Sequence, residues 1–431
     1  MASDATAPSG APHVVIIGGG FGGLAAAKGL RGAAARVTLV DRRNHHLFQP
    51  LLYQVATAAL NPSDIAQPIR RILRRQRNVS VILGEAAKID LAARKVVLRD
   101  EELFFDYLVV ATGATHSYFG HDNWEHSAPG LKTVEDALEI RRRVLVAYEA
   151  AERESAPAIQ REWLTFVIVG GGPTGVEMAG ALAEISRRVL ALDFRRIEPR
   201  RARIVLIEAA ARVLPAMSPE SSANASRQLD RLGVEVMTST AVTGVDDNGV
   251  NHASARLAAR TVIWAAGVAA SPLARSLGVP LDRAGRIAVG PDLTLGGEPR
   301  VFVIGDLAAL QLDGKPVPGV APAAMQEGRH AARNIVHSIR GEALEPFRYA
   351  DKGTLATIGR AAAVIDFGRI HLSGFVAWIL WLVVHIFYLI GFRNRVLVLT
   401  EWAWVYLRNE RGARLITGDV EPLLERGEHR P

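Results

Sequence analysis

The sequence predicts an α/β protein in which one doubly wound domain is inserted in another and an apolar helical segment follows. Three observations support this fold class. A glycine-rich β-α-β pattern occurs twice, over residues 13–41 and 165–208. A strand-like run that ends in small residues follows each copy, at 106–113 and 261–267. A pattern in which strands and helices alternate is typical of a parallel sheet covered by helices.

The first copy consists of an apolar run, a glycine-rich turn and an acid. It reads His13-Val-Val-Ile-Ile, then Gly18-Gly-Gly20-Phe-Gly-Gly23, and Asp41 closes the next apolar run. In such a motif the first glycine makes a tight turn, the second lets the backbone approach a pyrophosphate, and the third lets the helix pack on the strand. The helix N-terminus supplies unpaired N–H groups for the phosphates, and the acid accepts a hydrogen bond from a ribose hydroxyl. The pattern therefore predicts a Rossmann-like dinucleotide site.

The second copy repeats every part of the first. It reads Thr165-Phe-Val-Ile-Val, then Gly170-Gly-Gly172-Pro-Thr-Gly175, and Glu208 closes the next apolar run. A lone glycine-rich motif is often an ordinary turn, but two copies in full strand–turn–helix context, each with its acid, favour two dinucleotide sites. A carboxylate repels a 2′-phosphate and no arginine follows Glu208 directly, so the second site is predicted to prefer NADH over NADPH.

The composition excludes several classes of protein. The chain of 431 residues has no cysteine, which excludes disulfide scaffolds, thiolate metal sites, and the dithiol and sulfide-oxidising types of flavin reductase. No cluster of His, Asp and Glu has metal-ligand spacing, so no metal is expected. The net charge of +7 would suit a nucleic-acid binder, but the arginines are scattered without interleaved aromatic residues. Solvated helix faces explain them better, followed by attraction to an anionic membrane surface.

The segments around the two motifs complete the expected order of elements. Residues 1–12 are small and polar and lack the features of a signal peptide, which predicts a disordered tail on a protein that stays in the cytoplasm. We expect loop and helix over 45–77 and short strands over 79–98. Residues 133–154 are predicted to form an exposed helix that begins at an N-cap, and 155–163 a crossing between domains.

One more buried strand is predicted at 301–306, where it ends in Gly305-Asp306. The first glycine-rich site, the 106–113 strand and this strand would build one domain around the inserted second repeat. The predicted domains are 13–162 together with 284–350, the insert 163–283, and a C-terminal domain 351–431.

With these motifs in place, the chain resembles the type II NADH dehydrogenases. These are single-subunit, FAD-dependent NADH:quinone oxidoreductases of the two-dinucleotide-binding-domain flavoprotein superfamily. The dinucleotide motifs are shared by the whole superfamily, whereas the run Phe48-Gln-Pro-Leu-Leu-Tyr53 and the C-terminal stretch are more specific. The segments that carry the resemblance are 45–56, 170–177, 305–306, 321–328, 389–395 and 411–417.

The resemblance implies that the first site holds FAD and the second holds NADH, so the outer domain would bind FAD and the insert NADH. Asp306 would bind the ribityl chain of FAD rather than only cap a turn, and Thr112 would line the cofactor from the other side. The cofactor-binding residues assigned on this basis are Gly18, Gly20, Phe21, Gly22, Gly23, Asp41, Thr112, Gly113, Gly305, Asp306, Ala323, Gly170, Gly172, Pro173, Thr174, Gly175, Glu208 and Gly267.

Three residues are candidates for a part in the reaction. Glu177 is placed in the first turn of the second glycine-rich helix, where an acid also suits the helix dipole. The resemblance places it near the flavin, the nicotinamide and the quinone entry, which implies a role in nicotinamide positioning or proton delivery. Gln326 lies in a segment that resembles the quinone-site helix of the family, although Pro322 stands where the family commonly has a glutamine. Proline fits the first turn of a helix, so this departure puts the quinone contact in doubt rather than the fold. Lys352 sits where the family has a flavin-side lysine that would stabilise reduced flavin, with a surface lysine as the alternative.

The C-terminal run 374–392 is apolar all round. At about 1.5 Å per residue it would nearly cross a hydrocarbon core of about 30 Å, so a transmembrane helix is one interpretation and a buried dimer interface another. His385 within the run, and the clustered Trp402, Trp404 and Tyr406 after it, favour a monotopic segment that lies on the membrane, as in the family. His385 itself is expected to be a packed or interfacial residue rather than a ligand.

The predicted function is oxidation of NADH through bound FAD and reduction of a membrane quinone, ubiquinone or menaquinone, without proton pumping. We expect a peripheral enzyme on the cytoplasmic face of the cell membrane, with no nucleic-acid partner, and the family implies a homodimer. One alternative is a soluble flavin reductase that passes electrons to a small redox protein or to oxygen, which would need no apolar tail. The other is a membrane-bound nucleotide sensor with negligible NADH turnover.

Overall fold

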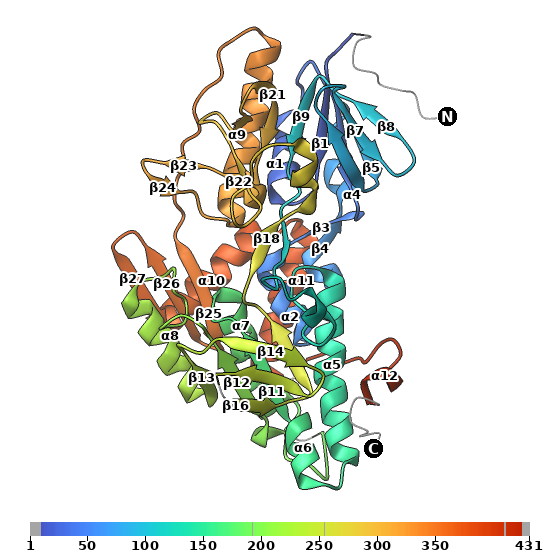
Figure 1. The fold of residues 1–431 in the computed structure, drawn as a ribbon. Coiled ribbons are helices and arrows are strands. Elements are labelled where there is room, and N and C mark those ends of the chain that lie inside the picture. Colours follow the sequence, from blue (N-terminus) through green and yellow to red (C-terminus); the bar gives the residue numbers. More distant parts are fainter. Residues whose placement is uncertain (1–9, 192, 254, 409–410, 425–431) are drawn as a thin grey trace. The chain divides into compact units, whose positions relative to one another are not determined.

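The computed structural model describes residues 10–191, 193–253, 255–408 and 411–424. Most of the predicted N-terminal tail, residues 1–9, therefore lies outside the described residues. The chain divides into two compact units (Figure 1). Each unit contains one complete glycine-rich repeat. The first unit is formed by residues 1–47, 66–115 and 268–352, and the second by residues 48–65, 116–267 and 353–431.

The first unit is built on a six-stranded sheet of order β20-β21-β9-β1-β2-β5. Its strand β1 (His13–Ile17) is buried along its whole length and pairs in parallel with β2 (Arg36–Asp41) and β9 (Tyr107–Val110). β21 (Glu298–Val303) pairs with β9. The prediction that the runs 106–113 and 301–306 share a sheet with the first repeat is therefore confirmed. Strands of this kind are buried on both faces, which is why they read as continuous apolar runs.

Two long helices pack together in this unit (Figure 1). α1 (Phe21–Gly29) is the helix of the first repeat, and α9 (Ala321–Ile339) lies against it. The approach is close, since a Cβ at Gly328 would stand 2.1 Å from the carbonyl oxygen of Gly22. Pro322 lies in the first turn of α9, as predicted. The smaller elements of this unit are β3 (His45–Leu47), β4 (Ala66–Pro68), α4 (Ile69–Leu73), β5 (Val79–Leu83), β6 (Ala86–Asp90), β7 (Lys95–Leu98), β8 (Glu102–Phe104), β18 (Val268–Ala270), β19 (Ile287–Ala288), β20 (Thr294–Leu295), β22 (Ala308–Ala309), β23 (Gln311–Leu312) and β24 (Lys315–Pro316).

The second unit is built on a parallel sheet of order β13-β12-β11-β17. β11 (Thr165–Val169) pairs with β12 (Arg203–Ile207) on one side and with β17 (Thr261–Trp264) on the other. β17 stands next to β11 as β9 stands next to β1, so the predicted internal repeat is confirmed. The other elements of this part are α2 (Leu52–Ala56), α3 (Pro62–Ile65), α7 (Pro173–Glu184), α8 (Pro219–Arg231), β13 (Val234–Met237), β14 (Val242–Asp246), β15 (Gly249–His252) and β16 (Ala255–Ala258).

The helix predicted over 133–154 is α5 (Val134–Arg153). It begins with a capping box, in which the Thr133 hydroxyl accepts from the Asp136 N–H and the Asp136 carboxylate accepts from the Thr133 N–H. The expectation that this helix is exposed was wrong, because more than half of its residues are buried. Its arginines look solvated in the sequence, but Arg143 is buried against Glu139 at 2.6 Å, so the helix can pack despite its charge. The crossing predicted at 155–163 contains a further helix, α6 (Pro157–Trp163).

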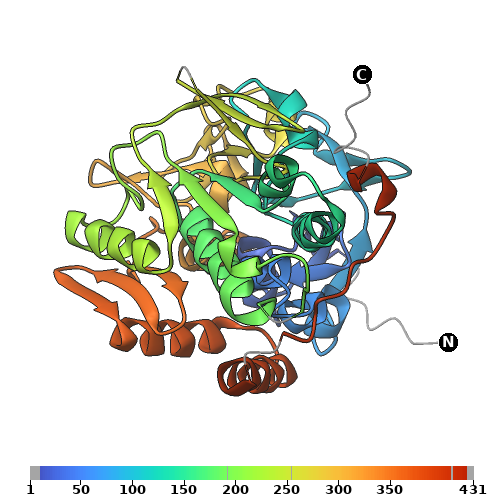
Figure 2. The same cartoon turned by 90° about the horizontal axis from the view of Figure 1, so that it is seen from below.

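The C-terminal part folds as a small sheet followed by helices. β25 (Thr354–Gly359), β26 (Ala362–Phe367) and β27 (Ile370–Gly374) form antiparallel hairpins. α10 (Phe375–Tyr388) and α11 (Phe392–Arg408) follow and lie at one edge of the second unit (Figure 2). The apolar run 374–392 is thus a shorter helix than its length suggests, because it breaks before α11. Within the described part of the chain, no helix is both long and apolar enough to span a membrane.

The compact units differ from the domain boundaries that the sequence predicts. Residues 116–162 were expected to belong with the first repeat and 351–431 to stand apart, but residues 116–267 and 353–431 pack into one unit with the second repeat. The reason is tertiary packing. α5 packs on α2 and α6, and β25 packs along α7. The order of motifs along the chain carries no signal for these contacts. The last short helix, α12 (Glu421–Leu424), also packs on α5.

Candidate active site

The glycine-rich turn of the first repeat is shaped by close backbone contacts. The Gly18 N–H donates to the Val40 carbonyl at 2.8 Å, and the residue has a φ of +101°. A Cβ at Gly18 would stand 2.3 Å from the Ala111 carbonyl oxygen, so only glycine fits. A Cβ at Gly20, in contrast, would meet nothing within 4 Å. The turn is therefore packed on its inner side and open at Gly20, as a loop that cradles a pyrophosphate requires.

Asp41, at the end of β2, is held by the backbone of this turn. Its carboxylate accepts from the Gly19 N–H at 2.5 Å and from the Arg43 N–H at 2.7 Å. The carbonyl of Gly19 accepts a hydrogen bond from Nδ1 of the buried His46 at 3.0 Å, and the His46 ring meets Phe21 edge to face. Burial lowers the pKa of His46 to about 4, so the ring is neutral at neutral pH. The acid and the turn are thus fixed in place before any ligand binds.

The second repeat has the same framework. The Gly170 N–H donates to the Ile207 carbonyl at 2.7 Å, and Gly170 has a φ of +111°. The Glu208 carboxylate accepts from the Gly171 N–H at 2.5 Å and from the Ala210 N–H at 2.7 Å. A Cβ at Gly172 would meet nothing within 4 Å. Pro173 and Thr174, which follow in the first turn of α7, are exposed.

The other residues assigned to FAD by sequence also lie in the first unit. The hydroxyl of Thr112 is buried and has no hydrogen-bond partner among the described residues, as expected for a group that meets a ligand. The Gly305 N–H, two residues after β21, donates to the Glu327 carboxylate at 2.5 Å. Burial raises the pKa of Glu327 to about 7, and the charge of Asp306 adds to this. The open turn and the unpartnered hydroxyl fit a dinucleotide such as FAD.

Four assigned glycines and one alanine have structural surroundings of their own. Gly113 has a φ of +64°. A Cβ at Gly267 would stand 2.7 Å from the Phe119 ring, so this glycine allows close packing in the second unit. Ala323 is buried in the first turn of α9. Gly22 and Gly23 are buried in α1, where Gly23 lies against the Gly18 carbonyl.

Glu177 lies in a cavity of the second unit rather than at the phosphate end of its helix. α7 has no acid in its first turn, because Glu177 is the fifth residue of the helix. The expected place in the first turn was therefore wrong, and the helix-dipole interpretation loses its basis. Its carboxylate accepts a hydrogen bond from the Thr357 N–H of β25 at 3.4 Å. This strand can approach α7 because Gly180 has no side chain; a Cβ there would stand 1.6 Å from the Ile358 carbonyl oxygen.

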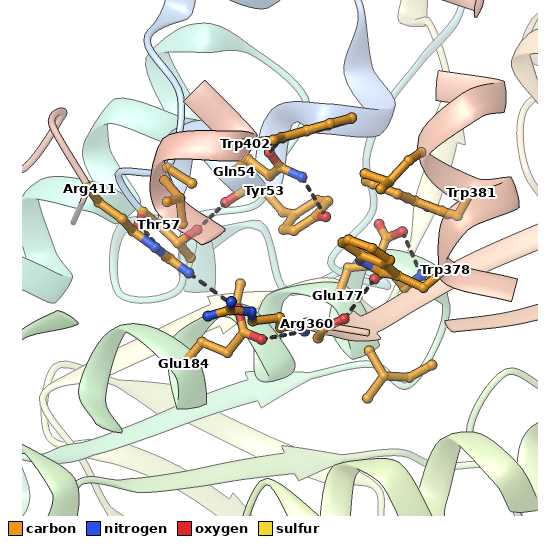
Figure 3. A pocket seen from close by; sticks show the side chains of 17 residues that line it. Tyr53, Gln54, Thr57, Glu177, Glu184, Arg360, Trp378, Trp381, Trp402 and Arg411 are labelled. Atoms are coloured by element: carbon orange, nitrogen blue, oxygen red, sulfur yellow. Dashed lines mark hydrogen bonds and ion pairs between the residues drawn. The ribbon is translucent and has the colours of Figure 1, made fainter. Parts of the chain in front are cut away.

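The cavity is about 100 Å³ in volume and is lined mainly by aromatic and polar side chains (Figure 3). Tyr53 and Gln54 come from α2, Trp378 and Trp381 from α10, and Trp402 from α11. Glu177, Ala181 and Glu184 come from α7, and Thr357 to Arg360 from β25 and the turn after it. The cavity is thus built by α7 of the second repeat together with the C-terminal helices and the short helix α2.

Burial among these side chains raises the pKa of Glu177 to about 8, although its hydrogen bond from Thr357 opposes the shift. The carboxyl is therefore protonated at neutral pH. The buried indole N–H of Trp381 faces the Glu177 carboxyl and opposes the shift as well. A protonated acid beside an indole N–H donor in an aromatic-lined cavity is suited to a ligand that carries carbonyl oxygens.

Arg411 closes one side of the cavity with its charge neutralised. It is buried, donates to the Thr57 carbonyl at 2.7 Å and lies 3.5 Å from the Glu184 carboxylate. Burial lowers the pKa of Arg411, and the charge of Glu184 raises it. His385 is a packed residue, as expected. It is buried, its Nδ1 bonds the Trp381 carbonyl at 2.7 Å, and burial lowers its pKa to about 4.

Gln326 and Lys352 are not among the cavity residues. Both polar atoms of the Gln326 amide are engaged by the backbone of Ala350, one donating to its carbonyl and the other accepting from its N–H, each at 3.0 Å. Lys352 is exposed at the end of the first unit. The structure thus gives Gln326 a clear packing role and leaves its part in the reaction a prediction.

Sequence reasoning missed most of the cavity. Tyr53 and Gln54 were noted only as part of a motif, and Trp402 was assigned to the membrane interface. One available signal was the motif itself, because polar residues in an otherwise apolar run need buried partners. The tryptophans carried a second signal, since an indole N–H that leaves water must also find an acceptor.

Two family models match the chain. Residues 12–328 match the family described as pyridine nucleotide-disulphide oxidoreductase, and residues 352–409 match the one described as NDH2 C-terminal domain. The first match covers both glycine-rich repeats, and the second covers β25 to α11.

Several relatives match over most of their length. The type II NADH:quinone oxidoreductase Ndh of Mycobacterium tuberculosis is 46% identical over 424 residues, which cover 94% of this chain and 90% of that protein. A type II NADH:quinone oxidoreductase of Staphylococcus aureus is 32% identical, over 80% of this chain and 87% of that protein. Among solved structures, NDH2 from Plasmodium falciparum in complex with NADH has a TM-score of 0.86 at 21% identity, covering 95% of this chain and 100% of that one. The sulfide:quinone oxidoreductase of Aquifex aeolicus has a TM-score of 0.74 at 21% identity, covering 92% of this chain and 96% of that one. At these identities the two structures show a shared fold.

Proposed function

This chain belongs to the type II NADH:quinone oxidoreductases, and on that premise we propose which of its residues carry the two halves of the reaction. The protein oxidises NADH and reduces a quinone, with FAD as its cofactor. When bound, FAD supplies the acceptor for the hydride of NADH and the donor of two electrons to the quinone. The chain itself supplies binding, orientation and proton positioning.

The first repeat is proposed to hold FAD and the second to hold NADH. The open sides of the turns at Gly20 and Gly172 would receive the two pyrophosphates, and the tethered Asp41 and Glu208 the adenosine riboses. The unpartnered Thr112 hydroxyl and the acids near Gly305 support the FAD assignment within the first unit.

The cavity around Glu177 is proposed to hold the quinone head group. The observation that carries this proposal is a protonated carboxyl in an aromatic-lined cavity: burial raises the pKa of Glu177 to about 8. A quinone head is a flat apolar ring with two carbonyl oxygens. Tryptophan rings suit its faces, and O–H or N–H donors suit its oxygens. Reduction of the quinone also takes up protons, and a carboxyl whose pKa lies near the working pH is a good donor for this step.

The experiment that tests the proposal is Glu177→Gln in stopped-flow measurements of the two half-reactions. Bleaching of the flavin by NADH should keep its rate, because the change lies in the quinone cavity. Recovery of the flavin colour with a short-chain quinone should slow by about 100-fold, which is within the usual contribution of a general acid. The matched control is Glu220→Gln, an exposed acid in α8, which should change neither rate.

The pH dependence gives a second readout of the same group. Quinone reduction should fall as the pH rises through about 8, where Glu177 loses its proton, and Glu177→Gln should show a low rate without this fall. The folded state binds this proton more tightly than the unfolded chain does. The free energy of unfolding should therefore fall as the pH rises from 4.5 to about 8, by up to about 1.4 kcal/mol per pH unit. Unchanged quinone kinetics and an unchanged pH profile in Glu177→Gln would show that the quinone binds elsewhere.

A membrane-facing role for the C-terminal helices is also proposed. One face of α10 exposes large apolar side chains, and four of them are each at least 60% exposed: Phe375, Val376, Val383 and Phe387. An exposed apolar surface of this kind is unusual in a protein that contacts only water. We propose that this face docks the enzyme as a monotopic homodimer on the cytoplasmic side of the cell membrane. Substitution of Val383 and Phe387 by serine should release the protein from lipid vesicles and leave NADH oxidation with a water-soluble quinone intact.

A further inference from the structure

A chain of hydrogen bonds with one possible direction runs from α11 to the cavity. The indole nitrogen of Trp402 lies 2.7 Å from the side-chain oxygen of Gln54, and the Gln54 amide nitrogen lies 2.9 Å from the Tyr53 hydroxyl (Figure 3). The oxygen and nitrogen of an amide are ordinarily hard to tell apart in a structure. Here the indole N–H settles the choice, because it can only donate, so the atom facing it must be the amide oxygen.

The orientation of Gln54 in turn fixes the role of Tyr53. An amide NH₂ can only donate, so the Tyr53 hydroxyl accepts this hydrogen bond and keeps its own hydrogen for another partner. Tyr53 and Gln54 are only 6% and 8% exposed. Among the described residues, the Tyr53 hydroxyl makes no hydrogen bond other than the one that it accepts from Gln54. A buried O–H without an acceptor is costly, so it is expected to meet a ligand.

The hydroxyl stays protonated under all ordinary conditions. Burial raises the pKa of Tyr53 well above its usual value, and the carboxyl of Glu177 raises it further. Tyr53 and Glu177 line the same cavity. The two residues therefore present two oxygen-bound hydrogens to one space, but only the carboxyl has a pKa at which it can release its proton near neutral pH.

We propose that Tyr53 donates a hydrogen bond to a carbonyl oxygen of the quinone, and that Gln54 and Trp402 are positioning residues that hold the Tyr53 hydroxyl in this donor state. The inference rests on the proposed quinone site. No proton leaves Tyr53. In the balanced reaction NADH, one proton and the quinone give NAD⁺ and the hydroquinone, and the hydrogen bond only stabilises the negative charge that grows on the oxygen as the electrons arrive.

The proposal makes Gln54→Glu its most informative variant. Glutamate has nearly the size of glutamine and still accepts from the Trp402 N–H, but its second oxygen accepts where the amide donated. The Tyr53 hydroxyl would then donate to residue 54 and no longer to the quinone. Tyr53→Phe removes the donor outright, and Trp402→Phe leaves the amide free to rotate. Trp404→Phe is the matched control, because Trp404 is on the same helix, is 51% exposed and does not line the cavity.

Three rates separate this role from a structural one. Flavin bleaching by NADH should be unchanged in every variant. Reoxidation by a short-chain quinone in detergent should slow about tenfold in Tyr53→Phe and Gln54→Glu, the effect of about one hydrogen bond, and about threefold in Trp402→Phe. Reoxidation by ferricyanide should be unchanged, because two ferricyanide ions each take one electron and present no quinone carbonyl. The Trp404→Phe variant should match the wild type in all three.

The hydrogen-bond chain from Trp402 through Gln54 to Tyr53, here called the relay, is tested most directly by whether the effects of the variants add. If Trp402 acts only through Tyr53, the double variant Tyr53→Phe/Trp402→Phe should be no slower than Tyr53→Phe alone. Multiplied effects in the double variant, or loss of ferricyanide reduction in the single variants, would overturn the relay. Failure of the quinone site itself has another signature, since Glu177→Gln and Tyr53→Phe would then both leave quinone reduction unchanged. A slow Glu177→Gln with a normal Tyr53→Phe would reject the relay alone.

Discussion

The two glycine-rich repeats of this chain share one backbone framework and differ in what covers their helices. In each, the first glycine N–H donates to the strand that carries the acid, at 2.8 Å in the first repeat and 2.7 Å in the second. In each, the acid accepts from the second glycine at 2.5 Å and from the second residue after itself at 2.7 Å. The two glycine-rich turns and their acids thus share one hydrogen-bonded structure.

The helices that follow are covered in different ways. α1 packs against α9, which approaches through glycines on both helices, whereas α7 packs against the strand β25 across Gly180. Counted from the first glycine of each motif, Ala25 in α1 corresponds to Glu177 in α7, and Ala25 is buried. Ala25 thus carries only a methyl group on a helix that packs closely against another helix. The contact of α7 with a sheet and with α10 leaves a cavity, and the carboxyl occupies it. The comparison shows that the elements packed on each helix, and not the glycine-rich repeat itself, determine whether a titratable side chain can stand at this position.

The largest effects are expected from valine substitutions in the two glycine turns, because each should abolish or weaken the binding of a different nucleotide. Gly20 and Gly172 both have extended backbone, and a Cβ at either meets nothing within 4 Å, so valine should be tolerated by the fold at both. Each valine would occupy the space of a pyrophosphate. Gly20→Val should yield protein without FAD. Gly172→Val should keep its FAD and lose about 100-fold in kcat/KM for NADH, a cost of about 3 kcal/mol.

Flavin absorbance of the purified variants and steady-state kinetics check both outcomes, and thermal unfolding should show that both proteins are folded. A Gly172→Val protein that lacks FAD, or a Gly20→Val protein that retains it, would contradict the assignment of the cofactors to the two repeats.

How much the sequence could predict follows from how local each feature is. The glycine turns and their acids were predictable, because the hydrogen bond from turn to acid spans only 22 positions in the first repeat and 37 in the second, and each residue has a fixed task at the nucleotide. The capping box of α5 was predictable for the same reason. The surroundings of Glu177 were not, because its hydrogen-bond partner Thr357 lies 180 residues further along the chain.

The exposure of α5 was predicted wrongly, and the aromatic cavity was missed, for a related reason. Charge along α5 suggested a solvated helix, but ion pairs such as Arg143 with Glu139 let it pack. Trp402 looked like an interfacial residue, and its contact with Gln54 spans 348 positions. Aromatic residues at a C-terminus are compatible with a membrane surface and with a cavity wall, and only the packing of α10 and α11 on α2 and α7 distinguishes the two.

A smaller effect is expected where the repeats satisfy one carbonyl in different ways. The Gly19 carbonyl accepts from the His46 side chain at 3.0 Å, whereas the equivalent Gly171 carbonyl accepts from the backbone N–H of Leu214 at 2.7 Å. His46→Leu should therefore leave a buried carbonyl without a partner, lowering the free energy of unfolding by about 1–3 kcal/mol and weakening FAD retention. Leu214→Gly keeps the backbone donor at a residue with a φ of +49°, although it removes a side chain that is only 1% exposed and so lowers the free energy of unfolding by about 2–5 kcal/mol. The difference between the repeats is therefore measured by FAD release rates: FAD retention should be weakened in His46→Leu and kept in Leu214→Gly, and equal FAD loss in both variants would contradict it.

The smallest expected effect concerns the two acids, which have the same hydrogen bonds but different partners to reject. FAD has no 2′-phosphorylated counterpart to exclude, whereas the second site must distinguish NADH from NADPH. Glu208→Gln removes the charge that repels a 2′-phosphate and keeps an oxygen for the Gly171 N–H. The ratio of kcat/KM for NADPH to that for NADH should rise about tenfold, a change of about 1.4 kcal/mol. Asp41→Asn should leave the ratio unchanged and affect FAD retention alone. A Glu208→Gln enzyme with an unaltered ratio would mean that the carboxylate serves only to tether the turn, and that the coenzyme preference lies elsewhere in the second unit.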